Sequence, residues 1–148
     1  MTKILVLDLE GTLISNAMSQ LPRPGLYDFL TFCFERFDGV VLYTAVRATK
    51  AREILCSLVD EGLAPPAFAT MSIVQWNPRE TRKELRRVCE LFSGSSLHSV
   101  RIVDDDEDWI VEAEREFWFP IAYWESPYSE DDRALFGMME TLQKWYLS

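Results

Sequence analysis

The chain contains 148 residues, of which 48% are hydrophobic, 26% charged and 13% aromatic. This composition excludes collagen-like, low-complexity and wholly disordered proteins, and the length suits one domain that spans residues 1–148. The formal net charge of −9 makes the surface repel polyanions. We therefore expect no binding to nucleic acid and no attachment to anionic membranes.

The cysteines and the apolar runs indicate a compartment. Cys33, Cys56 and Cys89 form neither a disulfide framework nor a CxxC zinc pattern, and their apolar neighbours favour buried free thiols under reducing conditions. The first apolar run meets Asp8 too early for a secretory signal, and no run approaches the roughly 20 residues of a membrane span. We therefore expect a cytoplasmic protein.

Predicted strands and helices alternate in the first half of the chain. The short apolar runs at residues 4–7 and 40–43 are typical of buried strands. Between them, apolar residues spaced i, i+3, i+4, i+7, i+8 and i+11 predict a helix over residues 26–37. A second helix is expected over residues 48–61, with Gly62 as its C-terminal stop.

The alternation continues in the second half. Residues 68–74, 100–103 and 117–123 are the expected third, fourth and fifth strands. Asn77-Pro78-Arg79-Glu80 offers an N-cap followed by a proline and predicts a helix that continues through Phe92. Ser129-Glu130-Asp131-Asp132 resembles a capping box that opens the final helix. These elements predict an α/β protein with three α/β/α layers around a parallel five-stranded sheet.

Polar residues follow three of the predicted strands. Asp8 follows the first strand, Thr44 the second, and Asp104-Asp105 the fourth. Because the carboxyl ends of parallel strands meet at one edge of a sheet, we expect these side chains to gather there. Clustered carboxylates repel each other and invite a divalent cation, and oxygen-only ligands of this kind favour Mg²⁺.

The same edge offers groups that suit an anion. Gly11 permits a sharp backbone turn whose amides can cradle a phosphate. Thr44 can donate a hydrogen bond to it, and Lys83, expected early in the helix after the third strand, can add a positive charge. Taken singly, Thr44 is also typical of a helix cap, Lys83 of a solvated charge and residues 104–108 of an acidic loop. Their joint order favours a site.

These residues resemble a known superfamily. Asp8-Leu9-Glu10-Gly11-Thr12 is similar to the DxDGT signature of the haloacid dehalogenase (HAD) superfamily of phosphohydrolases. Thr44, Lys83 and Asp104-Asp105 fall in the order of its second, third and fourth motifs. The resemblance implies a Rossmann-like HAD fold, and the intervals between the motifs leave no room for a large cap domain.

The closer resemblance is to the branch of C-terminal-domain and NIF-type (NLI-interacting-factor-like) phosphatases. Residues 23–30, Arg-Pro-Gly-Leu-Tyr-Asp-Phe-Leu, look like the start of its first helix, and Leu42-Tyr43-Thr44-Ala45 is similar to its second motif. Phe119-Pro120-Ile121 and the acidic residues 129–132 also look like it. The resemblance spans essentially the whole chain.

The resemblance implies a mechanism. Asp8 would attack phosphorus and form an aspartyl-phosphate that water then hydrolyses. A Mg²⁺ ion would be held by Asp8, the backbone carbonyl of Glu10 and Asp104, with Asp105 as a further ligand or a neighbour of one. Thr44 and Lys83 would stabilise the remaining charge. The substrate-binding positions carried over from the family are Leu9, Gly11, Thr12, Thr44, Ala45 and Lys83.

Glu10 departs from the family pattern, in which an aspartate protonates the leaving group and then activates water. A carboxyl group remains, but an added methylene moves it, and a displacement of about 1 Å can cost on the order of 10²-fold in rate. Two alternatives therefore stay open beside hydrolysis. One is a catalytically impaired module that binds phosphate or a protein, and the other is phosphoryl transfer to an acceptor other than water.

The expected partner is a phosphorylated protein or a small phosphomonoester. An accessible site without a large cap suits either, and the family resemblance favours phosphoserine or phosphothreonine in a protein. We expect a monomer or a weak dimer. His98, the single histidine, is expected on a surface loop, while Trp76 and Trp109 follow predicted strand ends and are candidates for the border of the site.

Overall fold

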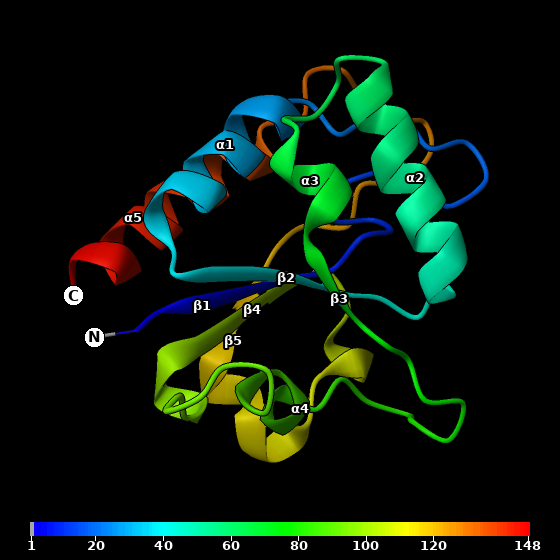
Figure 1. Ribbon diagram of the computed structural model, residues 1–148. Helices are drawn as coiled ribbons and strands as arrows, with labels where there is room; N and C mark the ends of the chain where they lie inside the picture. Colours follow the sequence, from blue (N-terminus) through cyan, green and yellow to red (C-terminus); the bar gives the residue numbers. More distant parts are fainter. Residues whose placement is uncertain (1) are drawn as a thin grey trace.

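A parallel five-stranded sheet organises the computed structural model, which describes residues 2–148; Met1 of the expected domain lies outside them. The order is β3-β2-β1-β4-β5, and every neighbouring pair is parallel (Figure 1). The strands are β1 (Ile4–Leu7), β2 (Gly39–Tyr43), β3 (Ser72–Val74), β4 (Val100–Asp104) and β5 (Trp118–Pro120). The predicted α/β fold with a parallel sheet is confirmed.

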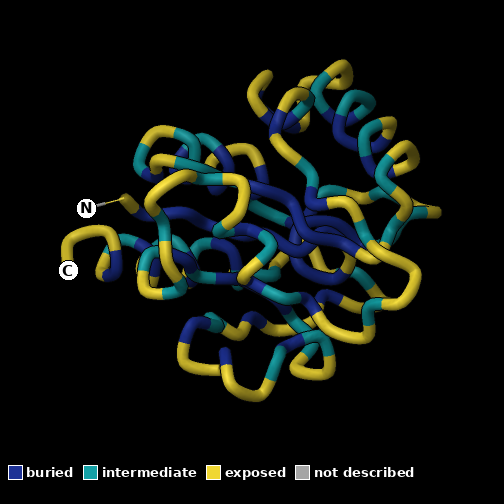
Figure 2. Tube along the Cα trace, turned by 60° about the horizontal axis from the view of Figure 1, so that its bottom comes forward, coloured by how far each residue is buried: buried dark blue, intermediate teal, exposed yellow. Residues whose placement is uncertain are grey.

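Both faces of the sheet are covered. Successive side chains of a strand point to opposite faces, so each strand can contribute to two apolar cores. Leu5 and Leu7 of β1 belong to one apolar core, and Ile4 and Val6 belong to the other. The central strands β1, β2 and β4 therefore form most of the buried interior seen in dark blue in Figure 2. Strands buried on both faces explain why their sequences are continuous apolar runs without alternation.

The two helical layers are unequal (Figure 1). The first contains the longer helices, α1 (Leu26–Arg36), α2 (Ala48–Asp60) and α5 (Ala134–Leu147), together with the short α3 (Ala67–Thr70). The second contains α4 (Leu85–Cys89) and the 3₁₀ helices η1 (Leu97–Ser99), η2 (Glu107–Trp109) and η3 (Glu112–Phe117). This gives the predicted α/β/α layers, and no large cap domain is present within residues 2–148.

The start of β1 and the end of α5 lie on the same side of the molecule (Figure 1). The Lys3 ammonium is buried there and donates to the backbone carbonyls of Trp145, Tyr146 and Ser148. These carbonyls end α5, where a positive charge complements the helix dipole. One side chain therefore fastens the start of β1 to the end of the last helix.

The predicted third strand is too long at its start. Residues 67–70 form α3, and β3 begins only at Ser72. Pro65 and Pro66 precede this helix, and the N–H of Phe68 donates to the carbonyl of Pro65. Prolines are favoured at a helix start because their fixed φ suits the first turn, so this pair outweighs the strand propensity of the apolar residues after it.

The helix expected from Asn77 begins only at Leu85, so the prediction that Lys83 lies early in a helix is wrong. The capping contacts do form, since the N–H of Asn77 donates to Oε1 of Glu80 at 3.1 Å, but they close a single turn. The chain then extends, and the N–H of Lys83 donates to the carbonyl of Trp109 at 2.7 Å. This pairing directs the Lys83 side chain inward.

The fifth strand and the last helix are shorter than predicted. β5 ends at Pro120, and residues 121–123 leave the sheet. The acidic residues 129–132 form a turn before α5, which begins at Ala134. Within that turn Asp132 accepts the N–H of Ala134 at 3.3 Å but also binds Arg23, which keeps it outside the helix.

The thiols and the histidine were predicted in part. All three cysteines are free, and Cys33 is buried as expected, whereas Cys56 and Cys89 are only half-buried. Cys89 ends α4, a helix too short to cover it, and Cys56 lies on the flank of α2. His98 is exposed in η1.

Candidate active site

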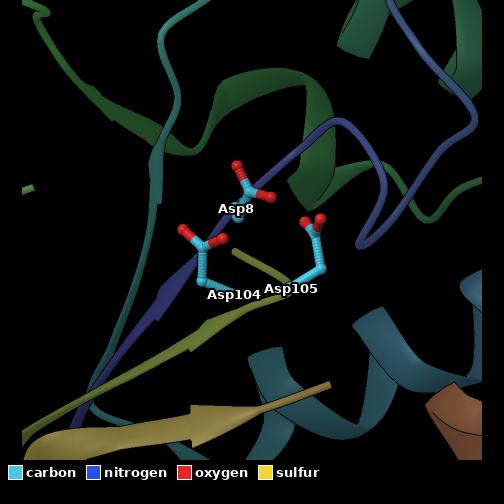
Figure 3. Close-up of side chains that lie close together, drawn as sticks. All are labelled: Asp8, Asp104 and Asp105. Carbon is cyan, nitrogen blue, oxygen red and sulfur yellow. The ribbon is translucent and has the colours of Figure 1, made fainter. Parts of the chain in front are cut away.

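Three aspartates converge at the carboxyl edge of the sheet. Asp8 follows β1 directly, Asp104 is the last residue of β4, and Asp105 comes next, so two adjacent strands deliver all three side chains (Figure 3). Asp8 and Asp104 are buried and Asp105 is half-buried. Thr44, which follows β2, is also buried, and it lines the same cleft as Asp8 and Asp105.

The three carboxylates suit a divalent cation. One oxygen from each lies within 4.8 Å of the others. Burial and the charge of Asp8 raise the pKa of Asp104 to about 7. Burial, a hydrogen bond with Asp8 and the charge of Asp8 raise the pKa of Asp105 to about 8. A bound Mg²⁺ would relieve this mutual repulsion, and its preferred ligands are oxygen atoms of this kind. The three residues therefore fit such an ion.

Lys83 reaches the same carboxylates from the loop before α4. Its Nζ lies 2.7 Å from Oδ1 of Asp8 and 2.5 Å from Oδ2 of Asp104, and the residue is 1% exposed. Burial acts to lower the pKa of Lys83, but the charges of Asp8 and Asp104 outweigh burial and raise it. The side chain therefore stays an ammonium ion, which compensates two buried negative charges.

The turn after β1 is closely packed. Oγ1 of Thr12 lies 2.9 Å from Oδ2 of Asp8 and 2.9 Å from Oδ1 of Asp105, within hydrogen-bond distance of both. Gly11 has a φ of 77°, and a Cβ there would lie 2.6 Å from the Tyr123 ring. Its N–H donates to the carbonyl of Ile14 at 2.8 Å. Only glycine satisfies both this backbone conformation and this contact.

Glu10 lies at the exposed edge of the site. It lines the cleft together with Asp8, and its Oε2 accepts the backbone N–H of Ala17 at 2.7 Å. This bond ties the carboxylate to the loop that follows the turn. Within the residues described, the carboxyl group of Glu10 does not belong to the cluster formed by the three aspartates.

The architecture and this arrangement agree with a comparison against protein families. Residues 3–147 match the model of the NLI interacting factor-like phosphatases. The chain belongs to this family. The family is part of the HAD-like group of C-terminal-domain phosphatases, which confirms the resemblance inferred from the motifs. A search of curated proteins gave no match.

Membership of a phosphatase family supports phosphatase function and implies a phosphorylated substrate. In this NLI interacting factor-like phosphatase Asp8 and Asp105 line a cleft of about 500 Å³, and Lys83 and Asp104 are buried behind them. Its walls are formed by the following residues: Asp8, Glu10, Thr44, Ala45, Asp105, Asp106, Trp109 and Tyr123. Among residues 2–148, no helix has the length and apolar character needed to cross a membrane.

The other sequence-predicted residues take different positions around the cleft. Ala45 is exposed and lines it directly. Leu9 is fully buried in the apolar core, so only its backbone can face a substrate. Trp109 lines the cleft, as the position after a strand end suggested, while Trp76 packs edge-to-face against it with ring centroids 5.2 Å apart.

Two residues of this phosphatase were not predicted from sequence. Tyr123 was assigned to the fifth strand, whereas it lies beyond the strand end and over Gly11. Arg23 was noted only as part of a family motif. Its buried guanidinium donates to the carbonyls of Gly11 and Thr12 at 3.2 and 3.1 Å and to Asp132 at 2.7 Å. Arg23 thus holds the turn at Gly11 and Thr12 through hydrogen bonds to its backbone.

Proposed function

We propose that the protein is a Mg²⁺-dependent phosphomonoester hydrolase that works through an aspartyl-phosphate on Asp8. The observation that carries this proposal is the position of Asp8. It lies at the base of an open cleft, 2.7 Å from the Lys83 ammonium, and it forms a carboxylate cluster with Asp104 and Asp105. A buried carboxylate beside a cation is a suitable nucleophile for a phosphate ester.

The reaction proceeds in two steps. A carboxylate oxygen of Asp8 attacks phosphorus, the ester P–O bond breaks, and the leaving oxygen takes the bonding electrons and a proton. A water molecule then attacks phosphorus in the aspartyl-phosphate, loses a proton, and releases inorganic phosphate and free Asp8. The Glu10 carboxyl, placed at the exposed edge of the cleft, is the group proposed to give the first proton and take the second.

The charge on the phosphoryl oxygens is stabilised by Lys83 and Thr44 in this proposal. The Lys83 ammonium already lies between Asp8 and Asp104. Oγ1 of Thr44 accepts the N–H of Val46 at 3.1 Å, which leaves the hydroxyl hydrogen available for a phosphoryl oxygen. Both residues are fixed before substrate arrives, which is the condition under which such contacts favour the transition state.

Asp8, Asp104 and Asp105, with the backbone carbonyl of Glu10, are the groups proposed to hold Mg²⁺. When bound, the ion supplies positive charge that offsets the negative charge of the transferring phosphoryl group. The proposed substrate is a phosphorylated serine or threonine in a protein, because the cleft is open and a protein segment can enter it from the surface.

The test is release of p-nitrophenol from p-nitrophenyl phosphate, with Mg²⁺ and with a chelator in its place. We expect turnover that requires Mg²⁺ and that falls to background in Asp8→Asn, an almost isosteric variant. Turnover by Asp8→Asn at a rate close to that of the unmodified protein would overturn the proposal. Mg²⁺-dependent binding of a phosphate mimic without turnover would favour the non-catalytic module instead.

A further inference from the structure

A second hollow, of about 570 Å³, adjoins the catalytic cleft between α2 and the loop after β3. We call it the Trp76 trough; it is lined by Arg47, Thr49, Trp76 and Pro78 among others, and it shares Ala45 with the cleft. Its walls are more apolar than those of the cleft, because an indole and a proline ring contribute to them. A ligand held at Asp8 can therefore continue into the trough without leaving the protein surface.

Aromatic packing fixes the trough to the catalytic cleft. The Trp76 ring packs edge-to-face on Tyr43 and on Trp109, with ring centroids 6.3 and 5.2 Å away. Trp109 lines the cleft, and the Lys83 ammonium lies 5.8 Å from its ring centroid. The half-buried indole of Trp76 is thus held in one orientation by groups that also border the phosphate site.

The charge of the Trp76 trough differs from that of the whole protein. The net charge of the chain is −9, yet the one charged side chain among the described residues that line the trough is the basic Arg47. Glu80, in the loop that follows Trp76 and Pro78, is engaged by Tyr43, whose hydroxyl donates to its Oε2 at 2.7 Å. The exposed Arg47 is therefore the cation best placed to meet a ligand in the trough.

The first turn of α2 adds to this positive potential. Ala48 and Thr49 line the trough, and no side chain among the described residues caps the helix start at Arg47. On the far rim of the cleft the chain is acidic instead, with Asp106 in the wall and Glu107 and Asp108 after it. A negatively charged ligand segment is thus directed toward α2 and away from β4.

We propose that the Trp76 trough binds the segment of an acidic phosphopeptide that flanks the phosphorylated residue. An apolar side chain next to that residue packs on Trp76 and Pro78, and a carboxylate beyond it pairs with Arg47. This inference rests on the proposed function, because it takes the phosphate to lie at Asp8. An extended peptide fits better than a small ester, since the trough adds a volume as large as the cleft itself.

The test is equilibrium binding of fluorescent phosphoserine peptides to the Asp8→Asn variant, followed by anisotropy. The parent peptide has leucine and glutamate after the phosphoserine; one derivative replaces leucine by glycine and another replaces glutamate by lysine. We expect each replacement to weaken binding about tenfold, as loss of a central contact does. Trp76→Ala should weaken binding of the parent peptide and erase the preference for leucine.

Charge reversal gives the sharper comparison. Arg47→Glu should weaken binding of the glutamate peptide at least tenfold and bind the lysine peptide more tightly than unmodified Arg47 does. Lys144→Glu, an equal charge change on exposed α5, should alter either affinity less than twofold. A gain for the lysine peptide cannot come from misfolding, so it separates recognition from loss of structure.

The outcomes also separate this inference from the proposed function. Equal affinity for all three peptides, or a 5′-phosphorylated oligonucleotide that binds more tightly than the parent peptide, overturns the trough as a peptide site, even where p-nitrophenyl phosphate is hydrolysed. If the expected peptide preferences appear but the unmodified protein hydrolyses no phosphate ester, the trough stands and the proposed function fails.

Discussion

Glu10 is the residue at which this chain departs from the HAD pattern, and its contacts give that departure a physical reason. Its Oε2 accepts the N–H of Ala17 at 2.7 Å, in the loop beyond the turn. An aspartate on the same backbone is one methylene shorter and would not span this distance. The longer side chain therefore suits the loop of this protein, and its carboxyl group still lines the cleft with Asp8.

Replacing Glu10 by glutamine tests its proposed role as a proton donor and acceptor. Glu10→Gln should lower kcat on the order of 10²-fold, because general acid–base catalysis contributes at least that much. The loss of kcat/KM, which reports the first step, should be larger with phenyl phosphate than with p-nitrophenyl phosphate, whose leaving group needs no proton. Glu10→Asp, which keeps a carboxyl group, is the matched control. Equal losses of kcat/KM with both substrates in Glu10→Gln would contradict the assignment.

Lys83 is the second residue with a measurable role of its own. Its ammonium compensates Asp8 and Asp104, both buried, so Lys83→Met leaves two carboxylates facing each other. We expect the free energy of unfolding in metal-free buffer to fall by about 3 kcal/mol, the cost of breaking a buried ion pair from one side. Urea denaturation measures this. A loss no greater than that of the exposed Lys144→Met would show that Lys83 compensates nothing.

At the scale of elements, Arg23 and Asp132 connect the turn at Gly11 and Thr12 to the start of α5. Arg23 is buried, donates to the carbonyls of Gly11 and Thr12, and pairs with Asp132 at 2.7 Å. The guanidinium also donates to the carbonyl of Ala122 at 2.7 Å, so it joins the turn after β1 to a segment about 100 positions later in the chain. The position of Tyr123 over Gly11 depends on the same contact.

The ion pair between Arg23 and Asp132 predicts that the stability of the folded protein depends on pH. Partial burial acts to raise the pKa of Asp132, but the hydrogen bond and charge of Arg23 outweigh it and lower this pKa below its usual value. A lowered folded-state pKa stabilises the protein above the unfolded value of about 3.9, and that contribution is lost as the pH falls through the folded value. Asp132→Asn should therefore be less stable than the unmodified protein at pH 7, and the difference should shrink below pH 4.

Thermal unfolding of both proteins between pH 3 and pH 7 measures this difference. Asp131→Asn, one position earlier and exposed, is the matched control, and it should follow the unmodified protein. A difference that stays constant down to pH 3 would mean that Asp132 contributes through its shape and not through its charge.

The elements also show how far sequence patterns reach. The strand ends that bear Asp8, Thr44 and Asp104 were predictable, because buried parallel strands are unbroken apolar runs and the residue after each run lies at the carboxyl edge of the sheet. The path of residues 77–84 was not predictable. Its local capping signal is real, but it competes with the long-range pairing of Lys83 with Trp109 and the aspartates, which no local pattern records.

Tyr123 and Arg23 illustrate the same limit within the site. Tyr123 belongs to an apolar run that is typical of a strand, but β5 ends at Pro120 and Tyr123 lies beyond it. The contacts of Arg23 join residues about 10 and 100 positions away along the chain. Contacts at such separations follow from the packing of elements, so they became visible only in the folded structure.

At the scale of the whole molecule, the surplus of acidic residues is unevenly distributed. Three aspartates are concentrated at one edge of the sheet, while the basic Arg47 lines the Trp76 trough. Because these aspartates gather only in the folded chain, an ion that binds them stabilises the folded state by mass action. We expect Mg²⁺ at about 100 times its Kd to add roughly 2.7 kcal/mol to the free energy of unfolding.

Differential scanning fluorimetry over a Mg²⁺ series measures this stabilisation through the Tm. Asp104→Asn should abolish most of the increase in Tm, whereas Glu140→Gln, which removes the same charge from exposed α5, should leave it intact. An equal increase in all three proteins would mean that Mg²⁺ acts only by screening the net charge of −9.

The central claim is that Asp8 receives the phosphoryl group, and the Glu10→Gln variant tests it most directly. With p-nitrophenyl phosphate, the first step needs no proton donor, but the second step lacks the base that activates water. Rapid mixing with Mg²⁺ should therefore give a burst of about one p-nitrophenolate per chain, and mass spectrometry after acid quenching should find the phosphoryl group on Asp8. Turnover without a burst, or a phosphoryl group on another residue, would contradict the account.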